Sequence, residues 1–446
     1  MPDSPLLPPD HPDRVALADE VHARPPEPLA APSRASYVAV RIDADARVAE
    51  MDHLAALCAH FDVPPPPSSG TQWAATLGPL RFKWERHGEF SSYTLFTAGL
   101  SPTPFAEPVV ALLPAGWLAG VPGQTVFAAH AKLVSAAALI GGDAGTPSAE
   151  QLAAHFGANV VVGAGLGDGA GMAFTDFVIH GDGFARFLLL DRTMTERQAG
   201  RMLQRLFEIE AYRMMALLAL PMARGLWPRL LQIERTLAGL TERIAQDAPR
   251  RAGADEALLH ELMALAAEIE SALAASQSRF GASRAYHALV ATRIAELREQ
   301  RIQGLQTIDE FMTRRLSPAM ATCVTVSQRL HDLSERVAQA SSLLRTRVDI
   351  ARQQQNQALL AATARRAKLQ LRLQQTVEGL SVAAIVYYSS GLVGYVAKAA
   401  KAAGLPLSPD LVTGLAVPVL GLGAWWVLRR VHRRIAADDE RSGSDH

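Results

Sequence analysis

The sequence predicts an α+β protein with an N-terminal antiparallel sheet domain, a helical bundle with a long stalk helix, and a C-terminal two-helix transmembrane hairpin. Three observations support this fold class. Short β-like runs separated by glycine and proline fill residues 35–192, and the pattern from residue 193 onward is helical. No proline occurs between Pro318 and Pro406, and the end of this stretch is uncharged, so one long helix is expected to enter a membrane.

The composition narrows the class of protein. The 446 residues hold 44 Lys and Arg against 44 Asp and Glu, so the zero net charge gives no reason to expect nucleic acid as a partner. Cys58 and Cys323 are the only cysteines, and they match no disulfide framework or zinc-ligand spacing. The first residues lack the basic start and apolar stretch of a signal peptide. We therefore expect insertion to depend on the C-terminal spans.

A proline-rich arm, residues 1–34, precedes the predicted sheet domain, residues 35–192. A helix is expected at Ala46–Phe61, where the four prolines 64–67 follow. Further strands are expected to complete an antiparallel sheet at Thr125–Val134, Ala158–Val162, Met172–His180 and Phe184–Leu190.

The clearest strand pair is a hairpin with a two-residue turn at His87-Gly88. Because side chains alternate along a strand, one face of the hairpin is apolar and the other polar. The apolar face holds Leu80, Phe82, Trp84, Tyr93 and Leu95, and the polar face holds Arg81, Lys83, Glu85, Ser92 and Thr94. We expect the apolar face in the core and the polar face in water.

Residues 193–317 form the predicted bundle. A capping box, Thr193 to Glu196, opens it, and Pro221 is expected to kink or break the first helix. The helices are expected at Met194–Ala219, Pro228–Gln246, Asp255–Ser278 and Arg284–Arg315.

Residues 318–378 are the predicted stalk, with apolar residues at coiled-coil spacing. This seam contains Val326, Leu330, Leu333, Val337, Ala340 and Leu344, and continues after a stutter at Val348 through Ala351, Ala358, Ala362, Leu369, Leu373, Val377 and Leu380. Such a stripe needs another helix to cover it, so we expect a homo-oligomer. The alternative is that helices of the same chain cover it.

Two uncharged runs, residues 379–397 and 411–428, have the length that a bilayer requires and predict a membrane hairpin. Cations flank it at Arg365, Arg366, Lys368 and Arg372 and again at Arg429, Arg430, Arg433 and Arg434. By the positive-inside rule both termini are expected in the cytoplasm, with residues 398–410 as a turn on the outer side and residues 429–446 as a basic cytoplasmic tail. A pore-lining or helix-packing face is expected from Ser381, Tyr388, Gly391 and Tyr395, with Gly394 in a small-residue pair with Ser390.

Several stretches resemble a bacterial family of uncharacterised membrane-anchored proteins, catalogued as a domain of unknown function. They include EVHARPPEPL at 20–29, RFKWERHGEF at 81–90, EIEAYRMMALLALP at 208–221 and TVEGLSVAAIVYY at 376–388. The resemblance implies an architecture and a membrane address, the bacterial inner membrane, where the turn at residues 398–410 would be periplasmic. It implies no activity. The order of parts is also similar to CorA-type divalent-metal channels, although residues 394–398, GYVAK, replace the Gly-Met-Asn signature of that family.

Charged residues of two motifs define the candidate site: His22 and Arg24 in the arm, and Arg81, Lys83, Glu85, His87 and Glu89 in the hairpin. We expect a ligand or intersubunit site where the arm folds over the hairpin, the alternative being a solvated face. The glycine-rich run 163–171 is expected to be a flexible loop, because no Gly-Lys-Ser/Thr follows it.

No serine, histidine and acid set and no metal-ligand spacing stands out, so we expect neither an enzyme nor a bound cofactor. The sequence favours a membrane-anchored scaffold or sensor of the cytoplasmic face. The alternative is a channel or transporter, with a divalent cation as its partner.

Overall fold

A computed structural model describes residues 11–14, 17–18, 25–68, 70–141, 145–246, 254–403, 406 and 408–442, with the backbone alone for residues 428 and 431–442. The chain forms two compact units, Met1–Ser342 and Leu343–His446. Each unit is described by itself.

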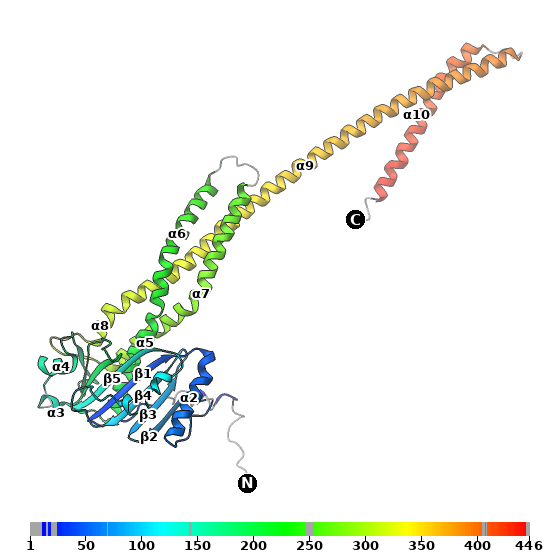
Figure 1. Cartoon of the computed structure of the whole chain (residues 1–446). Coiled ribbons are helices and arrows are strands. Elements are labelled where there is room, and N and C mark those ends of the chain that lie inside the picture. The colour runs from blue at the N-terminus through cyan, green and yellow to red at the C-terminus, as the bar shows by residue number, and fades with distance from the viewer. Residues whose placement is uncertain are drawn as a thin grey trace, which may run out of the picture. The chain divides into compact units, whose positions relative to one another are not determined.

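The first unit is built on one nine-stranded sheet in the order β2-β3-β4-β1-β5-β8-β7-β6-β9 (Figure 1). Its strands are β1 (Ser33–Arg41), β2 (Gln72–Leu77), β3 (Leu80–Arg86), β4 (Phe90–Ala98), β5 (Gln124–Ser135), β6 (Val162–Leu166), β7 (Gly171–Thr175), β8 (Ala185–Asp191) and β9 (Gln300–Arg301). The sheet is mixed, because β5 and β8 run parallel while the other neighbours are antiparallel. The expectation of a purely antiparallel sheet is therefore wrong. The helices α3 (Ala136–Ile140) and α4 (Ala149–Phe156) lie in the connection that returns the chain in the same direction.

The strand expected at Ala158–Val162 lies further along the chain. The first half of the glycine-rich run forms β6, so the run is only in part the loop that was expected. A Cβ atom on Gly163 would collide with the ring of Phe174 in β7, which explains why glycine occupies this strand position. β7 ends at Thr175, short of the expected His180, and the Asp176 carboxylate then accepts the N–H of Val178.

In the β3–β4 hairpin the side chains lie on the expected faces, but the two strands pair in a register that differs from the predicted one. The N–H of His87 donates to the carbonyl of Phe90, and Arg86 pairs with Ser91, so the turn is displaced from His87-Gly88. The shift is an even number of residues, and side chains therefore stay on the expected face.

The two faces of the sheet carry different helices. The 3-10 helix η1 (Ala44–Ala46) and α2 (Arg47–His60) belong to the face that buries Phe82, Trp84 and Tyr93. Two further 3-10 helices, η2 (Val109–Leu112) and η3 (Leu118–Gly120), complete that side. The opposite face packs on α5 (Glu196–Leu217). Thr195 caps α5 through a capping box with Gln198, so the expected box at Thr193 is wrong by two residues.

Two bundle helices are longer than predicted, α6 (Ala219–Ala245) and α7 (Ala254–Leu297). The single helix expected at Arg284–Arg315 is wrong, because its first part belongs to α7 and only its end forms a separate helix, α8 (Ile308–Arg315). The break expected at Pro221 is present, because α5 ends at Leu217 and α6 begins at Ala219. Pro221 lies in the first turn of α6, where its missing N–H would have no intrahelical partner. α7 continues through Phe280-Gly281, where the Phe280 side chain is buried. The tiny strand β9 then joins the sheet edge, although no strand was expected after residue 193.

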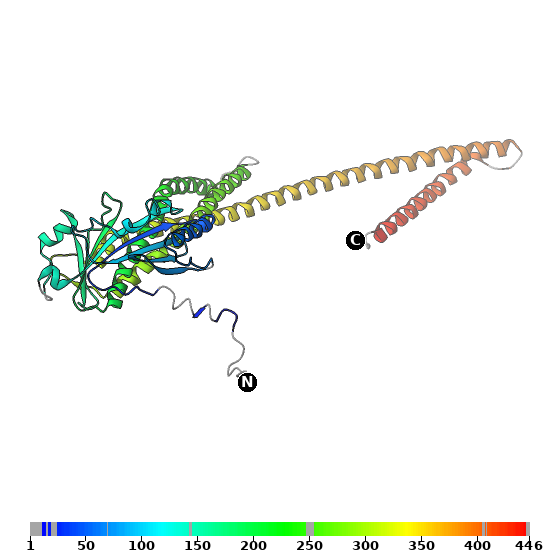
Figure 2. The same cartoon turned by 60° about the horizontal axis from the view of Figure 1, so that its bottom comes forward.

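The proline-free stretch forms one helix, α9 (Ser317–Ala402). Within the first unit its start lies beside α6 and α7 (Figures 1 and 2): the Arg329 guanidinium is 4.7 Å from the Trp227 ring centroid, and Ser334 Oγ donates to Glu270 Oε1 at 2.6 Å. The seam residues of this part, Val326, Leu330, Leu333 and Val337, are buried. At these positions the alternative holds, because helices of the same chain cover the seam.

The second unit contains the rest of α9 and α10 (Pro409–Ser442). All side chains from residue 349 to 377 are exposed. Both helices include a stretch long and apolar enough to cross a membrane. The helices extend beyond the predicted limits: α9 ends at Ala402, inside the expected turn, and α10 runs on through the expected tail to Ser442.

Candidate functional site

A short segment of the arm lies between the hairpin and α5. We call this segment, Pro25–Leu29, the strap. The N–H of Leu29 donates to the carbonyl of Glu196 at 2.9 Å, at the start of α5. From the hairpin, Lys83 Nζ donates to the Pro25 carbonyl at 2.8 Å and Arg81 Nη1 to the Pro28 carbonyl at 2.9 Å. The strap is thus held from both sides.

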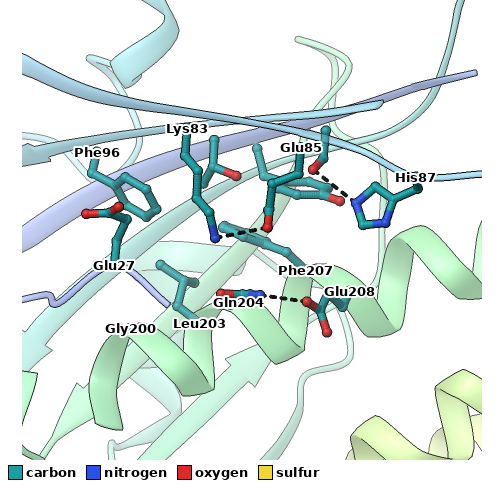
Figure 3. Close-up of a pocket in the computed structure, with 13 residues that line it drawn as sticks. Glu27, Lys83, Glu85, His87, Phe96, Gly200, Leu203, Gln204, Phe207 and Glu208 are labelled. Carbon is teal, nitrogen blue, oxygen red and sulfur yellow. Dashed lines mark hydrogen bonds and ion pairs between the residues drawn. The ribbon is translucent and has the colours of Figure 1, made fainter. Parts of the chain in front are cut away.

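A cavity lies beneath the strap, between the hairpin and α5 (Figure 3). Its lining combines residues of the strap, of β1, of the β3–β4 hairpin and of α5: Glu27, Tyr37, Lys83, Glu85, His87, Ser92, Thr94, Phe96, Gly200, Leu203, Gln204, Phe207 and Glu208. The cavity measures about 20 Å³, enough for one water molecule. A larger ligand would require the strap to move.

The hairpin supplies a buried ion pair to this cavity. Lys83 Nζ lies 3.0 Å from Glu85 Oε1, and each side chain is 6% exposed. The expectation that this face is wet is therefore wrong at these positions. Its alternating charges neutralise each other beneath α5 and the strap, which is how charged groups are tolerated away from water.

α5 adds a second carboxylate. Gln204 Nε2 donates to Glu208 Oε1 at 2.8 Å, and Arg293 of α7 donates to Glu208 Oε2. Tyr37 of β1 is fully buried beside these groups. Burial first, and then the charges of Tyr212, Glu85 and Glu208, raise the pKa of Tyr37 well above its usual value, so the phenol remains neutral.

The structure brings together only some of the predicted site residues. Lys83, Glu85 and His87 line the cavity, and Arg81 binds the strap. His22 and Arg24 lie outside the described residues.

Glu89 instead connects the hairpin to α7. It accepts two hydrogen bonds from Arg279, of 2.9 and 3.1 Å. Burial and the Glu89 carboxylate raise the pKa of Tyr286 to about 12. Glu89 therefore has a structural role within the first unit.

Sequence reasoning missed the cavity residues contributed by other elements. Tyr37, Gln204 and Glu208 are distant from the hairpin in sequence, and contact with it depends on the tertiary fold. Among these three residues, only Glu208 lies in a stretch that carries the family resemblance, EIEAYRMMALLALP at 208–221.

A serine, a histidine and an aspartate do meet on the other face of the sheet. Ser36 Oγ is hydrogen-bonded to His130 Nδ1 at 2.8 Å, and His130 Nε2 lies 3.8 Å from Asp182. Burial, reinforced by the charge of Arg186, lowers the pKa of His130 to about 3. Ser36 is fully buried and Asp182 is paired with Arg186, so this arrangement does not expose a nucleophile.

The residues predicted to share one face of the first span differ in their surroundings. Ser381, Tyr388, Gly391 and Tyr395 are exposed on α9. Gly394 instead faces α10, where a Cβ atom on it would stand 3.1 Å from Thr413 Oγ1. Over the described part of the chain, no three His, Cys, Asp or Glu side chains cluster closely enough to hold a metal ion.

Comparison with known proteins gives one match. The model of a family described as "Protein of unknown function (DUF3422)" matches residues 9–435, nearly the whole chain. No curated protein and no solved structure matches.

Proposed function

The chain belongs to the DUF3422 family, and from this premise we propose that it is a membrane-anchored homo-oligomer that acts as a scaffold or sensor at the cytoplasmic face of the bacterial inner membrane. The first unit would be the functional part, and α9 and α10 would hold it at the bilayer.

The observation that carries this proposal is the change from buried to exposed side chains along α9. Its start is buried by α6 and α7, whereas residues 349–377 are exposed. Leu369, Leu373 and Val377 of the seam are 66%, 70% and 59% exposed, on a segment that precedes the uncharged span. Apolar residues at helical spacing favour a partner helix, and a second copy of α9 offers the same stripe.

Strap contacts support the sensing role. Lys83 and Arg81 hold the strap through its carbonyl oxygens, over a cavity that contains an ion pair and two further polar side chains, Gln204 and Glu208. A ligand that competes for Lys83 would release the strap. We do not extend the proposal to cation conduction, because Lys398 and Lys401 place positive charge at the outer end of the first span in the proposed orientation.

Fractionation of bacterial membranes tests the anchoring. The full chain should remain in the membrane pellet after a carbonate wash, whereas a chain ending at Ser342, the limit of the first unit, should be in the supernatant. The fragment includes the start of α9 because buried residues there, Val326, Leu330 and Leu333, complete the bundle core. Release of the full chain by carbonate would refute anchoring by the two spans.

A further inference from the structure

Three cations lie on neighbouring strands of the sheet face that points away from α5. Alternate residues of β1, β5 and β8, including Tyr37, Ala129 and Phe187, pack in the core with α5. The residues between them therefore point to the other face. There, Arg34 of β1 pairs with Lys132 of β5, and Arg186 of β8 pairs with His130 of β5.

The charges of this cluster do not balance among the described residues. Arg34 lies 3.5 Å from Glu107, and Arg186 is paired with Asp182. Lys132 has a different kind of partner: its Nζ donates to His155 Nε2 at 3.4 Å.

His155 is neutral in this contact. Its Nδ1 donates to the Gln151 carbonyl at 2.9 Å, so Nε2 carries the lone pair, and burial lowers the pKa of His155. Three cations thus face two carboxylates. Since like charges directly opposite on neighbouring strands destabilise a sheet, the pairing of Arg34 with Lys132 favours an additional anion.

The same side chains have unused hydrogen-bond donors. Arg34 Nε and Arg186 Nη1 are buried and have no acceptor among the described residues. Lys132 Nζ has three N–H groups, of which one is used by His155. Buried donors without acceptors cost free energy, so a ligand that supplies acceptor oxygens would be stabilised here.

Phe105 lies against Arg186 and His155 in a strained backbone conformation. Its φ is 62°, in the left-handed region that a bulky side chain rarely occupies. The ring centroid is 5.1 Å from the Arg186 guanidinium and 6.1 Å from the His155 ring centroid. Strain of this kind concentrates at ligand sites. The neighbours Ala106 and Glu107 are exposed, so this loop is the part that would yield to an entering ligand.

We propose that Arg34, Lys132 and Arg186 form a binding site for a small oxyanion, namely the phosphate or carboxylate group of a small molecule. A guanidinium presents a planar fork that matches both groups, and the lysine adds a point charge. The anion supplies the missing negative charge and the missing acceptors. The site is separate from the strap cavity, which lies on the opposite face of the sheet.

Equilibrium binding to the purified full chain in detergent tests this site, with inorganic phosphate and acetate as probes. The wild type should bind one phosphate per chain, and Lys132→Met should weaken binding about tenfold or more, because it removes a charge-assisted hydrogen bond. Lys132→Arg keeps the charge and should retain binding. Arg41→Met is the matched control, since Arg41 is an exposed arginine of β1 paired with Asp43, and its binding should equal that of wild type.

Relative affinities for the two probes identify the ligand group: tighter binding of phosphate indicates a phosphate compound, and comparable binding of acetate indicates a carboxylate. A wild type that binds neither probe at about 10 mM, roughly tenfold above a millimolar Kd, would overturn the proposal. Undiminished binding by folded Lys132→Met would overturn it as well. Arg186→Lys provides a second variant, which should weaken binding because the guanidinium fork is lost.

Discussion

A Cβ atom on Gly200 would overlap the carbonyl oxygen of Glu27. The strap therefore lies against the backbone of α5 at a distance that only glycine permits. With Lys83 holding the Pro25 carbonyl from the other side, this contact fixes the strap over the cavity.

Gly200→Ala should displace the strap. We expect a loss of about 1–3 kcal/mol in the free energy of unfolding, typical of overpacking, and faster proteolytic cleavage before residue 30. The matched control is Gly225→Ala in α6, where a Cβ atom would meet nothing within 4 Å. That change should stabilise the helix by about 0.5–1 kcal/mol. Equal melting temperatures for the two variants would show that the strap does not rest on α5.

Lys83→Met should be costly because it leaves the Glu85 carboxylate buried without its cation. Removing one member of a buried pair costs about 3–5 kcal/mol. The double variant Lys83→Met with Glu85→Gln should be more stable than Lys83→Met alone, since the unpaired charge is gone. Denaturant titration of the three proteins measures the differences. A double variant no more stable than Lys83→Met would contradict the pairing.

Acid should destabilise the fold through His130. Its pKa is about 3 in the folded chain against 6.5 when unperturbed, so below pH 6.5 the unfolded state binds a proton that the folded state does not. Stability from this group is full above pH 6.5 and falls by about 1.4 kcal/mol per pH unit between pH 6.5 and pH 3. His130→Gln should remove this contribution. Plots of melting temperature against pH from pH 4 to pH 8 should therefore differ in slope between the two proteins, and parallel plots would mean that the pKa of His130 is the same in the folded and the unfolded chain.

A reporter fused after His446 should indicate cytoplasm, and one inserted at Gly404 should indicate periplasm, because the arginine clusters flank the two spans on one side. Alkaline phosphatase and green fluorescent protein fusions measure the two locations. A periplasmic C-terminus would reverse the proposed topology.

Local sequence patterns predicted the parts of the fold that local forces determine. Strand alternation placed Phe82 and Lys83 on opposite faces, and the absence of proline after Pro318 predicted the single helix α9. The uncharged runs predicted two helices that are apolar enough to cross a membrane. Each of these features depends on residues close together in sequence.

The parts that sequence reasoning missed depend on contacts between distant segments. Parallel pairing of β5 with β8 follows from a crossover connection, and β9 has two residues, too few for a periodic pattern. The candidate cavity needs Glu208 of α5 opposite Glu85 of β3, a meeting that no spacing in the sequence indicates. Burial of Val337 by the chain's own helices likewise required the fold, since the same spacing also predicts a partner chain.

The native mass of the purified full chain in detergent tests the central claim, a membrane-anchored homo-oligomer joined through the exposed part of α9. The account predicts a mass that is a multiple of the 47.9 kDa chain. Leu369→Asp combined with Leu373→Asp should shift it toward the monomer, whereas Leu371→Asp, which is exposed but off the seam, should leave it unchanged. Val337 is unsuitable for this test, because an aspartate there would be buried within the first unit. A wild type with the mass of a single chain would contradict the account.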